Sequence, residues 1–182
     1  MKKTLITLLL LIQVVNLSSQ NSKIEYENFK LQENKKLVWQ KIYDNKVSKD
    51  SIFTILSGFI SQNSFLNNLK YKDFTFSGYS NFLSISNTKG LSLAVQKEFN
   101  CFVKIEIKPN KYRVTISNVK FKPVSMDFGG ITFDDPMELE SLAVRNNHFE
   151  LRKNKKSKET LQRLNSDFIN LLELKNTKKD NW

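Results

Sequence analysis

The feature that most constrains the fold is a pair of alternating segments separated by a short turn. Cys101–Lys108 reads CFVKIEIK and Lys111–Ile116 reads KYRVTI, so apolar and polar side chains alternate along both. Successive side chains of a strand point to opposite faces of a sheet, so this pattern predicts two half-buried strands. Joined through Pro109 and Asn110, they form an antiparallel hairpin whose apolar faces coincide. The sequence therefore predicts an antiparallel sheet with one covered face.

The register of this hairpin follows from the apolar pattern. With a two-residue turn, Ile107 faces Tyr112 and Glu106 faces Arg113. A shift by one residue would place Ile107 opposite Arg113 and turn a charged side chain toward the apolar face. Pro109 at the first turn position disfavours the usual primed hairpin turns, so a slightly longer loop is the alternative at the tip.

Lys108, Lys111 and Arg113 form a basic cluster around this turn. Such a cluster can bind an anionic partner. It is also an ordinary composition for the solvated face of a sheet, where the cross-strand carboxylate of Glu106 would partner Arg113. Both interpretations stay open, and the three basic residues are candidates for a binding surface.

Two other segments show the helical spacing of apolar residues. In the first, Ser48 suits the N-cap, and Gly58 inside the helix predicts a close approach to the sheet. In the second, Ser157 is the expected N-cap. Each helix has a single apolar stripe, so both are expected to cover the same face of the sheet. The stripes are Ile52, Ile55, Leu56, Phe59 and Ile60 in the first helix, and Leu161, Leu164, Phe168, Leu171 and Leu172 in the second.

Further strands are expected before and between these elements. Lys36–Tyr43 predicts a first strand and Leu69–Gly78 another, by their alternation. Ser80–Asn87 and Leu91–Phe99 flank a turn in which Gly90 can take a positive φ. Strands and amphipathic helices in this order predict an α+β fold.

The chain divides into a leader, one domain and a tail. Residues 1–20 carry two lysines, the apolar run Leu5–Val15 and then small polar residues, which is the layout of a secretory signal peptide. This run is shorter than the about 20 apolar residues of a spanning helix, and a retained N-terminal anchor is the alternative. Residues 21–36 are expected to be a flexible leader, 37–174 a single domain and 175–182 a tail.

Within that domain, residues 123–156 are expected to form a long irregular connection. Connections of this length without regular structure are uncommon in a compact domain and often carry function. A short helical turn is expected within it, near Glu138–Val144. Asp134, Asp135 and His148 are its candidate binding residues.

Catalytic and metal-binding chemistry finds little support in the sequence. The chain has one histidine and one cysteine, fewer than a zinc site needs. Calcium bound by Asp134, Asp135 and a nearby glutamate is an alternative, but the spaced ligands of a known calcium loop are missing. We therefore expect no enzyme activity, no cofactor and no metal. The competing hypothesis is a hydrolase or transferase with its site in residues 123–150, which would bring His148 beside a carboxylate in a concave pocket.

The chain is basic, with a formal net charge of +11. A basic balance can indicate a nucleic acid or an anionic surface as partner. Here the lysines are scattered, and much of the excess falls in residues 151–159 and 175–182, which have the composition of a solvated linker and a tail. Export makes nucleic acid an unlikely partner. The single cysteine, Cys101, cannot form an internal disulfide and is expected to be a small buried residue.

The order of strand, capped helix and antiparallel strands resembles a known family. Val47–Phe65 and Phe102–Phe121, within about Leu37–Lys122, are similar to a secreted bacterial domain of unknown function with a TATA-box-binding-protein-like (TBP-like) fold. The resemblance implies a curved antiparallel sheet with helices packed on one face. It implies no enzymatic activity, because none is established for the family, and the name of the fold does not transfer DNA binding.

The sequence thus favours an exported domain, periplasmic or associated with the cell envelope, that binds a partner without catalysis. The expected partner is an envelope protein or an anionic surface such as lipid or polysaccharide. Binding to an anionic surface would weaken strongly with salt.

Overall fold

The computed structural model describes residues 23–124, 127–128, 131–132 and 135–174. The predicted signal peptide, the tail 175–182 and Asp134 therefore lie outside the described residues. In the described part of the chain, no helix has both the length and the apolar character needed to span a bilayer.

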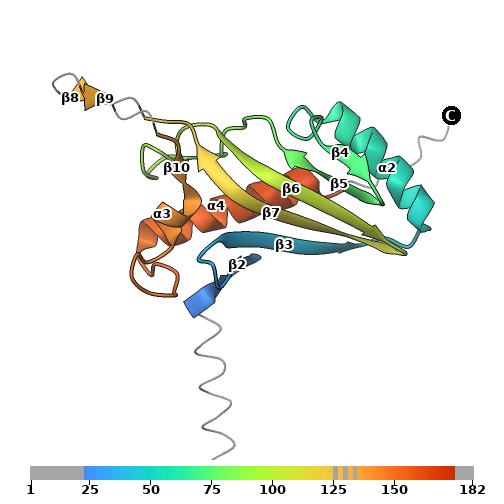
Figure 1. Ribbon diagram of the computed structural model, residues 1–182, viewed down its shortest axis with the longest axis horizontal. Helices are drawn as coiled ribbons and strands as arrows, with labels where there is room; N and C mark the ends of the chain where they lie inside the picture. Colours follow the sequence, from blue (N-terminus) through green and yellow to red (C-terminus); the bar gives the residue numbers. More distant parts are fainter. Residues whose placement is uncertain (1–22, 125–126, 129–130, 133–134, 175–182) are drawn as a thin grey trace, which may run out of the picture.

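The fold is α+β, with one open antiparallel sheet and two long helices (Figure 1). The sheet has eight strands, in the order β1-β2-β3-β7-β6-β5-β4 with β10 paired to the end of β7. Its strands are β1 Glu25–Tyr26, β2 Phe29–Leu31, β3 Leu37–Asp44, β4 Lys70–Lys72, β5 Thr75–Tyr79, β6 Phe99–Lys108, β7 Lys111–Phe121 and β10 Met137–Glu138. A separate hairpin pairs β8 Asp127–Phe128 with β9 Ile131–Thr132. The helices are α2 Lys49–Gln62, α3 Leu139–Ala143 and α4 Lys155–Leu172.

β6 and β7 form the predicted hairpin in the predicted register. Ile107 pairs with Tyr112, and Glu106 pairs with Arg113. The turn has two residues rather than a longer loop, and Asn110 takes a φ of 63°. A proline with its fixed φ followed by a residue at positive φ is the backbone pattern of a type II turn.

A β-bulge in β7 keeps the apolar residues beyond the hairpin turned inward. Between Ser117 and Lys120 the register with β6 gains one extra residue on β7, and Asn118 there takes a φ of 51°. The buried positions accordingly change from the even series, which ends at Ile116, to an odd series that begins at Val119. A bulge of this kind reverses the face on which the following residues lie.

Both long helices cover the same face of the sheet, as predicted. Phe168 of α4 packs against Trp39 of β3, with ring centroids 5.5 Å apart. Phe53 of α2 packs against Phe76 of β5, with centroids 5.9 Å apart. Strand pairing places Trp39 and Phe76 on one face, because their ladder positions on β6 are two residues apart. In Figure 1, α4 lies behind β6 and β7.

The sheet covers only part of each predicted apolar stripe. In α2, Ile55 is 44% exposed and Phe59 is only partly buried. In α4, Leu171 is also only partly buried. Each predicted stripe is wider than the part of the helix surface that contacts the sheet, so some of its residues stay partly exposed. The fully buried members are Ile52, Leu56 and Ile60 in α2, and Leu161, Leu164, Phe168 and Leu172 in α4.

One of three local predictions about the helices is confirmed. Ser48 is the N-cap of α2, and its side chain accepts a backbone N–H bond. The predicted cap of α4 is wrong: Asn154 is the N-cap and accepts the N–H of Ser157 at 2.8 Å, while the Ser157 hydroxyl donates to the Leu142 carbonyl at 2.7 Å. The close approach at Gly58 is also wrong, since a Cβ there would meet nothing within 4 Å.

Part of the predicted flexible leader, residues 21–36, belongs to the sheet instead. β2 pairs with β3, and Phe29 and Leu31 are only 1% and 2% exposed. The Asn28 side-chain amide donates to Asn165 of α4 at 2.8 Å. β2 has only three residues, and its two apolar side chains are too few to show the alternation by which a strand is predicted from sequence. The core therefore begins before the predicted boundary at residue 37.

The segment Leu69–Gly78, predicted as one strand, is the tight hairpin β4–β5. Its turn residues Asp73 and Phe74 take φ values of 49° and 57°. Two central residues at positive φ are typical of a type I′ turn, which usually carries asparagine or glycine. The Lys49 ammonium lies 3.3 Å from the centre of the Phe74 ring. This turn was missed because its residues continue the alternation.

The two strands predicted around Gly90 do not form. Residues 80–98 are irregular, apart from an isolated bridge between Leu83 and Phe99. Gly90 does take a positive φ, of 87°. The predicted short helical turn in the long connection is confirmed as α3, and β10 precedes it.

Candidate functional site

The face of the sheet opposite the helices carries the predicted basic cluster. The hairpin places Lys108, Lys111 and Arg113 together around the β6–β7 turn. They border a shallow depression of about 100 Å³. Its lining consists of Ile42, Glu106, Lys108, Lys111, Tyr112 and Arg113.

Glu106 is the centre of an ion-pair network on this face. Its Oε2 accepts hydrogen bonds from Nε and Nη2 of Arg113 at 2.9 and 2.7 Å, which confirms the predicted cross-strand pair. Its Oε1 accepts from the Lys104 ammonium at 3.0 Å. Burial raises the pKa of Glu106, but the bonds from Lys104 and Arg113 more than offset this effect and hold the pKa below its ordinary value. The guanidinium of Arg113 is therefore already engaged by a carboxylate.

Unlike Arg113, Lys108 and Lys111 are not engaged in an ion pair among the described residues. Within the described residues, no carboxylate oxygen lies within 4.0 Å of either ammonium group. The two residues face each other across the ladder next to the turn. Their like charges repel, and the exposed carboxylate of Asp44 on β3, paired in register with Lys111, offsets them only in part, so this end of the sheet attracts an anion.

Two residues of this surface were not among the binding candidates predicted from the sequence. Ile42 lies beside Arg113 because β3 pairs with β7, and it is 55% exposed. Lys104 joins through its bond to Glu106. The alternation of β3 indicated that Ile42 faces away from Trp39, but only the pairing of distant strands places it next to the basic cluster.

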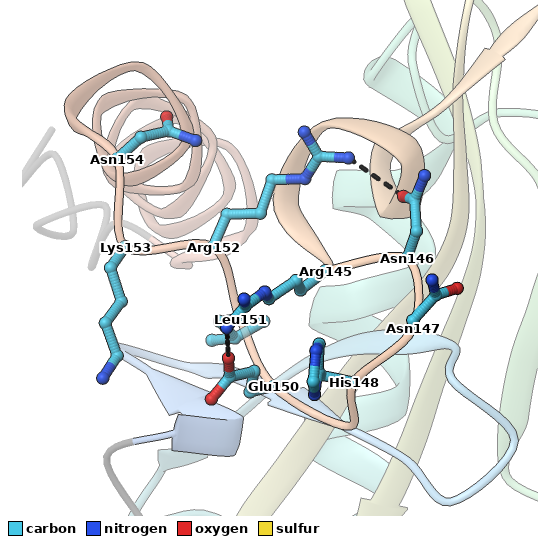
Figure 2. A pocket seen from close by; sticks show the side chains of 9 residues that line it. All are labelled: Arg145, Asn146, Asn147, His148, Glu150, Leu151, Arg152, Lys153 and Asn154. Atoms are coloured by element: carbon cyan, nitrogen blue, oxygen red, sulfur yellow. Dashed lines mark hydrogen bonds and ion pairs between the residues drawn. The ribbon is translucent and has the colours of Figure 1, made fainter.

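A second concave region of about 600 Å³ is formed by the loop that contains His148 (Figure 2). All of its lining residues belong to the segment 145–154. The loop is closed by a bridge between Val144 and Leu151, and the Leu151 N–H donates to the Lys23 carbonyl at 2.7 Å.

The charged groups of this loop mainly bond to each other. Nη1 of Arg145 lies 2.5 Å from a carboxylate oxygen of Glu150, and this hydrogen bond lowers the pKa of Glu150. The Arg152 guanidinium donates to the Val144 carbonyl at 2.9 Å and to the Asn146 side chain at 3.0 Å. Figure 2 shows the Arg145–Glu150 and Arg152–Asn146 contacts. These bonds maintain the shape of the loop.

The acidic candidates of the long connection lie elsewhere. Asp135 is exposed and does not line the concave region around His148. Glu138 bonds to the ammonium groups of Lys36 at 3.0 Å and Lys120 at 3.6 Å, and its pKa is lowered, mainly by the hydrogen bond from Lys36. The structure thus does not bring His148 together with Asp135 or Glu138. In the part of the chain that is described, no cluster of three or more histidine, cysteine, aspartate or glutamate side chains could hold a metal ion.

Cys101 is buried in the core, as predicted, with 0% of its surface exposed. Burial raises the pKa of its thiol to about 12, and the hydrogen bond with Ser80 only partly opposes this effect. At neutral pH the residue is therefore a thiol. The reactive species of cysteine is the thiolate, so Cys101 is not a nucleophile in this environment.

An open antiparallel sheet with helices on one face and a polar opposite face defines an α+β domain of the TBP-like type. Two solved structures share this fold. The first is a TBP-like protein from Parabacteroides distasonis, with a TM-score of 0.53 and 14% identity over 77% of this chain and 90% of that chain. The second is a DUF4468 family protein from Bacteroides ovatus, with a TM-score of 0.54 and 14% identity over 87% of this chain and 97% of that chain.

The resemblance inferred from the sequence is thereby confirmed for the fold. No protein-family model matches the chain, and no curated protein matches it either. At 14% identity the likeness concerns the arrangement of the backbone and carries no residue roles.

Proposed function

We propose that this chain is an exported, non-catalytic domain that binds an acidic protein partner through the open face of its sheet. The observation that carries the proposal is the end of the sheet at the β6–β7 turn. There Lys108 and Lys111 border a depression next to the exposed side chain of Ile42. Two cations beside an apolar group suit an acidic segment that also carries an apolar side chain.

The ion-pair network supports a binding role for the two lysines rather than for Arg113. Arg113 is bonded twice to Glu106, so its main contribution is to hold the surface in shape. A depression of about 100 Å³ is well below the roughly 300 to 1,000 Å³ of an ordinary small-molecule pocket. The contact would therefore be a surface contact, with the partner lying across the strands.

The competing function is a hydrolase or transferase with its site in residues 123–150. The concave region around His148 is the observation in its favour. The acidic group there is Glu150, which is already paired with Arg145. A general acid–base pair needs a carboxylate that is available to orient the histidine, so this geometry supports the binding function better.

Binding is tested with two immobilised probes, a polyglutamate peptide and vesicles of phosphatidylglycerol. The double variant Lys108→Glu/Lys111→Glu should lose most of its affinity for polyglutamate, and the affinity of the wild-type protein should fall steeply as salt is raised. The matched control is Lys155→Glu/Lys158→Glu, which makes the same charge change on α4. Equal losses in the two double variants would show that only net charge matters and would contradict a site at the turn. Binding to the vesicles alone would replace the protein partner by a lipid surface.

Export is tested by N-terminal sequencing of the protein recovered from the cell envelope. Cleavage after Ser19 or Gln20 predicts a new N-terminus at Gln20 or Asn21, motivated by the two lysines and the short apolar run that precede it. An intact Met1 on protein from the soluble cytoplasmic fraction would contradict export.

A further inference from the structure

The end of the open face remote from the β6–β7 turn carries exposed aromatic side chains. Tyr79 of β5 and Phe102 of β6 are paired across the two strands, and their ring centroids lie 5.4 Å apart. Tyr79 is 54% exposed, and Phe82, in the segment that follows β5, is 47% exposed. The open face is turned toward the viewer in Figure 1, since α4 lies behind β6 and β7. Neighbouring exposed rings, unlike a single exposed apolar residue, indicate an interaction site.

Two contacts of Lys122 place Phe82 on the same face. The Lys122 ammonium lies 4.5 Å from the centre of the Phe82 ring, and it is also paired with Glu98. Because Phe99 is fully buried and side chains alternate along a strand, Glu98 points to the outer face, as Phe102 does. Three residues therefore form what we call the aromatic patch: Tyr79, Phe82 and Phe102.

Uncharged polar side chains border the aromatic patch. Ser117 of β7 is paired with Phe102. Asn100 lies two residues before Phe102 on β6, so the two share a face. Ser77 has the same relation to Tyr79 on β5. Hydroxyl and amide groups both donate and accept hydrogen bonds, so the patch combines apolar ring surface with groups that suit a partner rich in hydroxyl groups.

The lysines next to the aromatic patch are paired with carboxylates. Three of them each lie within ion-pair distance of a glutamate: Lys104 with Glu106, Lys120 with Glu138, and Lys122 with Glu98. At the other end of the face, Lys108 and Lys111 have no such partner among the residues that the structure describes. The charges around the patch therefore complement an uncharged ligand, whereas the β6–β7 turn attracts an anion.

The size of the patch also limits its ligand. An aromatic side chain has a surface of about 150 to 250 Å², so two rings that are each half exposed offer roughly that area in total. A stable protein interface covers about 800 Å² on each partner. A pyranose sugar is much smaller, and its apolar C–H face stacks on an aromatic ring while its hydroxyl groups bond to polar side chains at the rim. The dimensions favour a sugar over a second copy of the chain.

We propose that the aromatic patch binds a neutral polysaccharide, with sugar rings stacked on Tyr79 and Phe82 and a sugar hydroxyl bonded to Asn100. This site is separate from the basic cluster. Phe102 and Lys108 are six residues apart on β6, which corresponds to about 20 Å along a strand. The proposal therefore does not depend on the proposed function of the cluster.

Affinity electrophoresis of the protein in native gels tests the proposal. Each gel contains one of three neutral polysaccharides (dextran, galactomannan or hydroxyethylcellulose) or the anionic polygalacturonate. We expect at least one neutral polysaccharide to retard the wild-type protein. The dissociation constant obtained from a concentration series should not change as salt is raised, because the contact involves no net charge.

Alanine variants locate the site. Tyr79→Ala and Phe82→Ala should each weaken the binding by about tenfold, as expected for the loss of one aromatic contact. Phe149→Ala is the matched control and should bind as the wild-type protein does, because Phe149 is 43% exposed but lies in the loop around His148. The double variant Lys108→Glu/Lys111→Glu should also keep its affinity. Far-UV circular dichroism checks that all variants are folded.

Four results would overturn the proposal. Retardation by none of the three neutral polysaccharides would exclude the ligand class, and retardation by polygalacturonate alone would replace it by an anion. Equal losses in Phe82→Ala and Phe149→Ala would show that the patch is not the site. A dimer in analytical ultracentrifugation that Phe82→Ala dissociates would assign the patch to a second copy of the chain. Polyglutamate binding through the basic cluster is measured separately, so failure of one proposal is distinguishable from failure of the other.

Discussion

Glu106 is the residue on which the order of the open face depends. Its carboxylate accepts bonds from Lys104 and from two nitrogens of Arg113, and its side chain is 23% exposed. Cross-strand pairs of this kind contribute roughly 0.2 to 1 kcal/mol to a sheet. Removing the carboxylate would leave the side chains of Lys104 and Arg113 without their shared acceptor. We expect these two side chains to change position more than the free energy of unfolding changes.

The first prediction is a pH-dependent loss of stability in Glu106→Gln. The pKa of Glu106 in the folded state lies below its unfolded value of about 4.3. A depressed carboxyl pKa stabilises the fold above the unfolded value, and this contribution is lost as pH falls through the folded value. Urea unfolding should show the variant less stable by under about 1 kcal/mol at pH 7. The difference should shrink as the pH falls below the unfolded value and through the folded one, and a difference that stayed constant over the whole acid range in which the protein is folded would contradict this account.

At the scale of elements, the two helices show that an apolar stripe is wider than the contact it makes. Phe168 is fully buried and its ring packs against those of Phe29, Trp39 and Phe99. Phe59 also belongs to a predicted stripe, yet it lines an open groove between α2 and the end of α4. The two phenylalanines should therefore differ in their energetic contribution, although the sequence predicted both to be core residues.

The second prediction compares these two positions. Phe168→Ala should lower the free energy of unfolding by roughly 3 to 5 kcal/mol, because it leaves a cavity in a packed cluster. Phe59→Ala should cost less than about half as much, because solvent already reaches its site. Chemical denaturation of both variants measures the difference. Equal costs would mean that the groove is closed in solution.

The third prediction concerns the glycine within α2. Gly58→Ala should raise the free energy of unfolding by up to about 1 kcal/mol, because alanine has the higher helix propensity and its methyl group meets no atom. A thermal melt of the variant beside the wild-type protein measures this gain in stability. A loss of stability would instead support the close approach to the sheet that the sequence had suggested.

At the scale of the whole molecule, the folded domain begins earlier in the chain than the regular apolar pattern predicts. β1 and β2 extend the sheet beyond β3, and the side-chain oxygen of Asn165 on α4 accepts hydrogen bonds from the Asn28 amide and the Trp39 indole N–H, both at 2.8 Å. The segment before residue 37 is thereby joined to the sheet and to α4. A chain that began at residue 37 would lose both contacts and expose the core side of β3.

The fourth prediction tests this boundary. Phe29→Ala should cost roughly 3 to 5 kcal/mol, since the side chain is 1% exposed and contacts the ring of Phe168. Lys30→Ala, on the exposed face of the same strand, is the control and should change stability by under about 0.5 kcal/mol. If both substitutions were silent in a thermal melt, residues 21–36 would be the flexible leader first expected.

The sequence by itself determined the elements with a long, regular period. The β6–β7 register, the cap at Ser48 and the two amphipathic helices could be predicted because each depends on residues within a few positions of one another. Elements with a short or broken period were missed: the β4–β5 turn at Asp73 and Phe74, the short strand at Phe29, and the bulge at Asn118. Their residues carry too few repeats for a pattern.

Only the tertiary structure decided which side chains share a surface. Ile42 joins the basic cluster because β3 pairs with β7, some seventy positions later in the chain, and the groove exists because α2 and α4 lie side by side on one face. It also separated His148 from Asp135 and Glu138, which the sequence had grouped in one connection. Periodicity reports the local environment of a residue, whereas a binding surface is made of contacts between distant segments, and these are set by the packing of the whole chain.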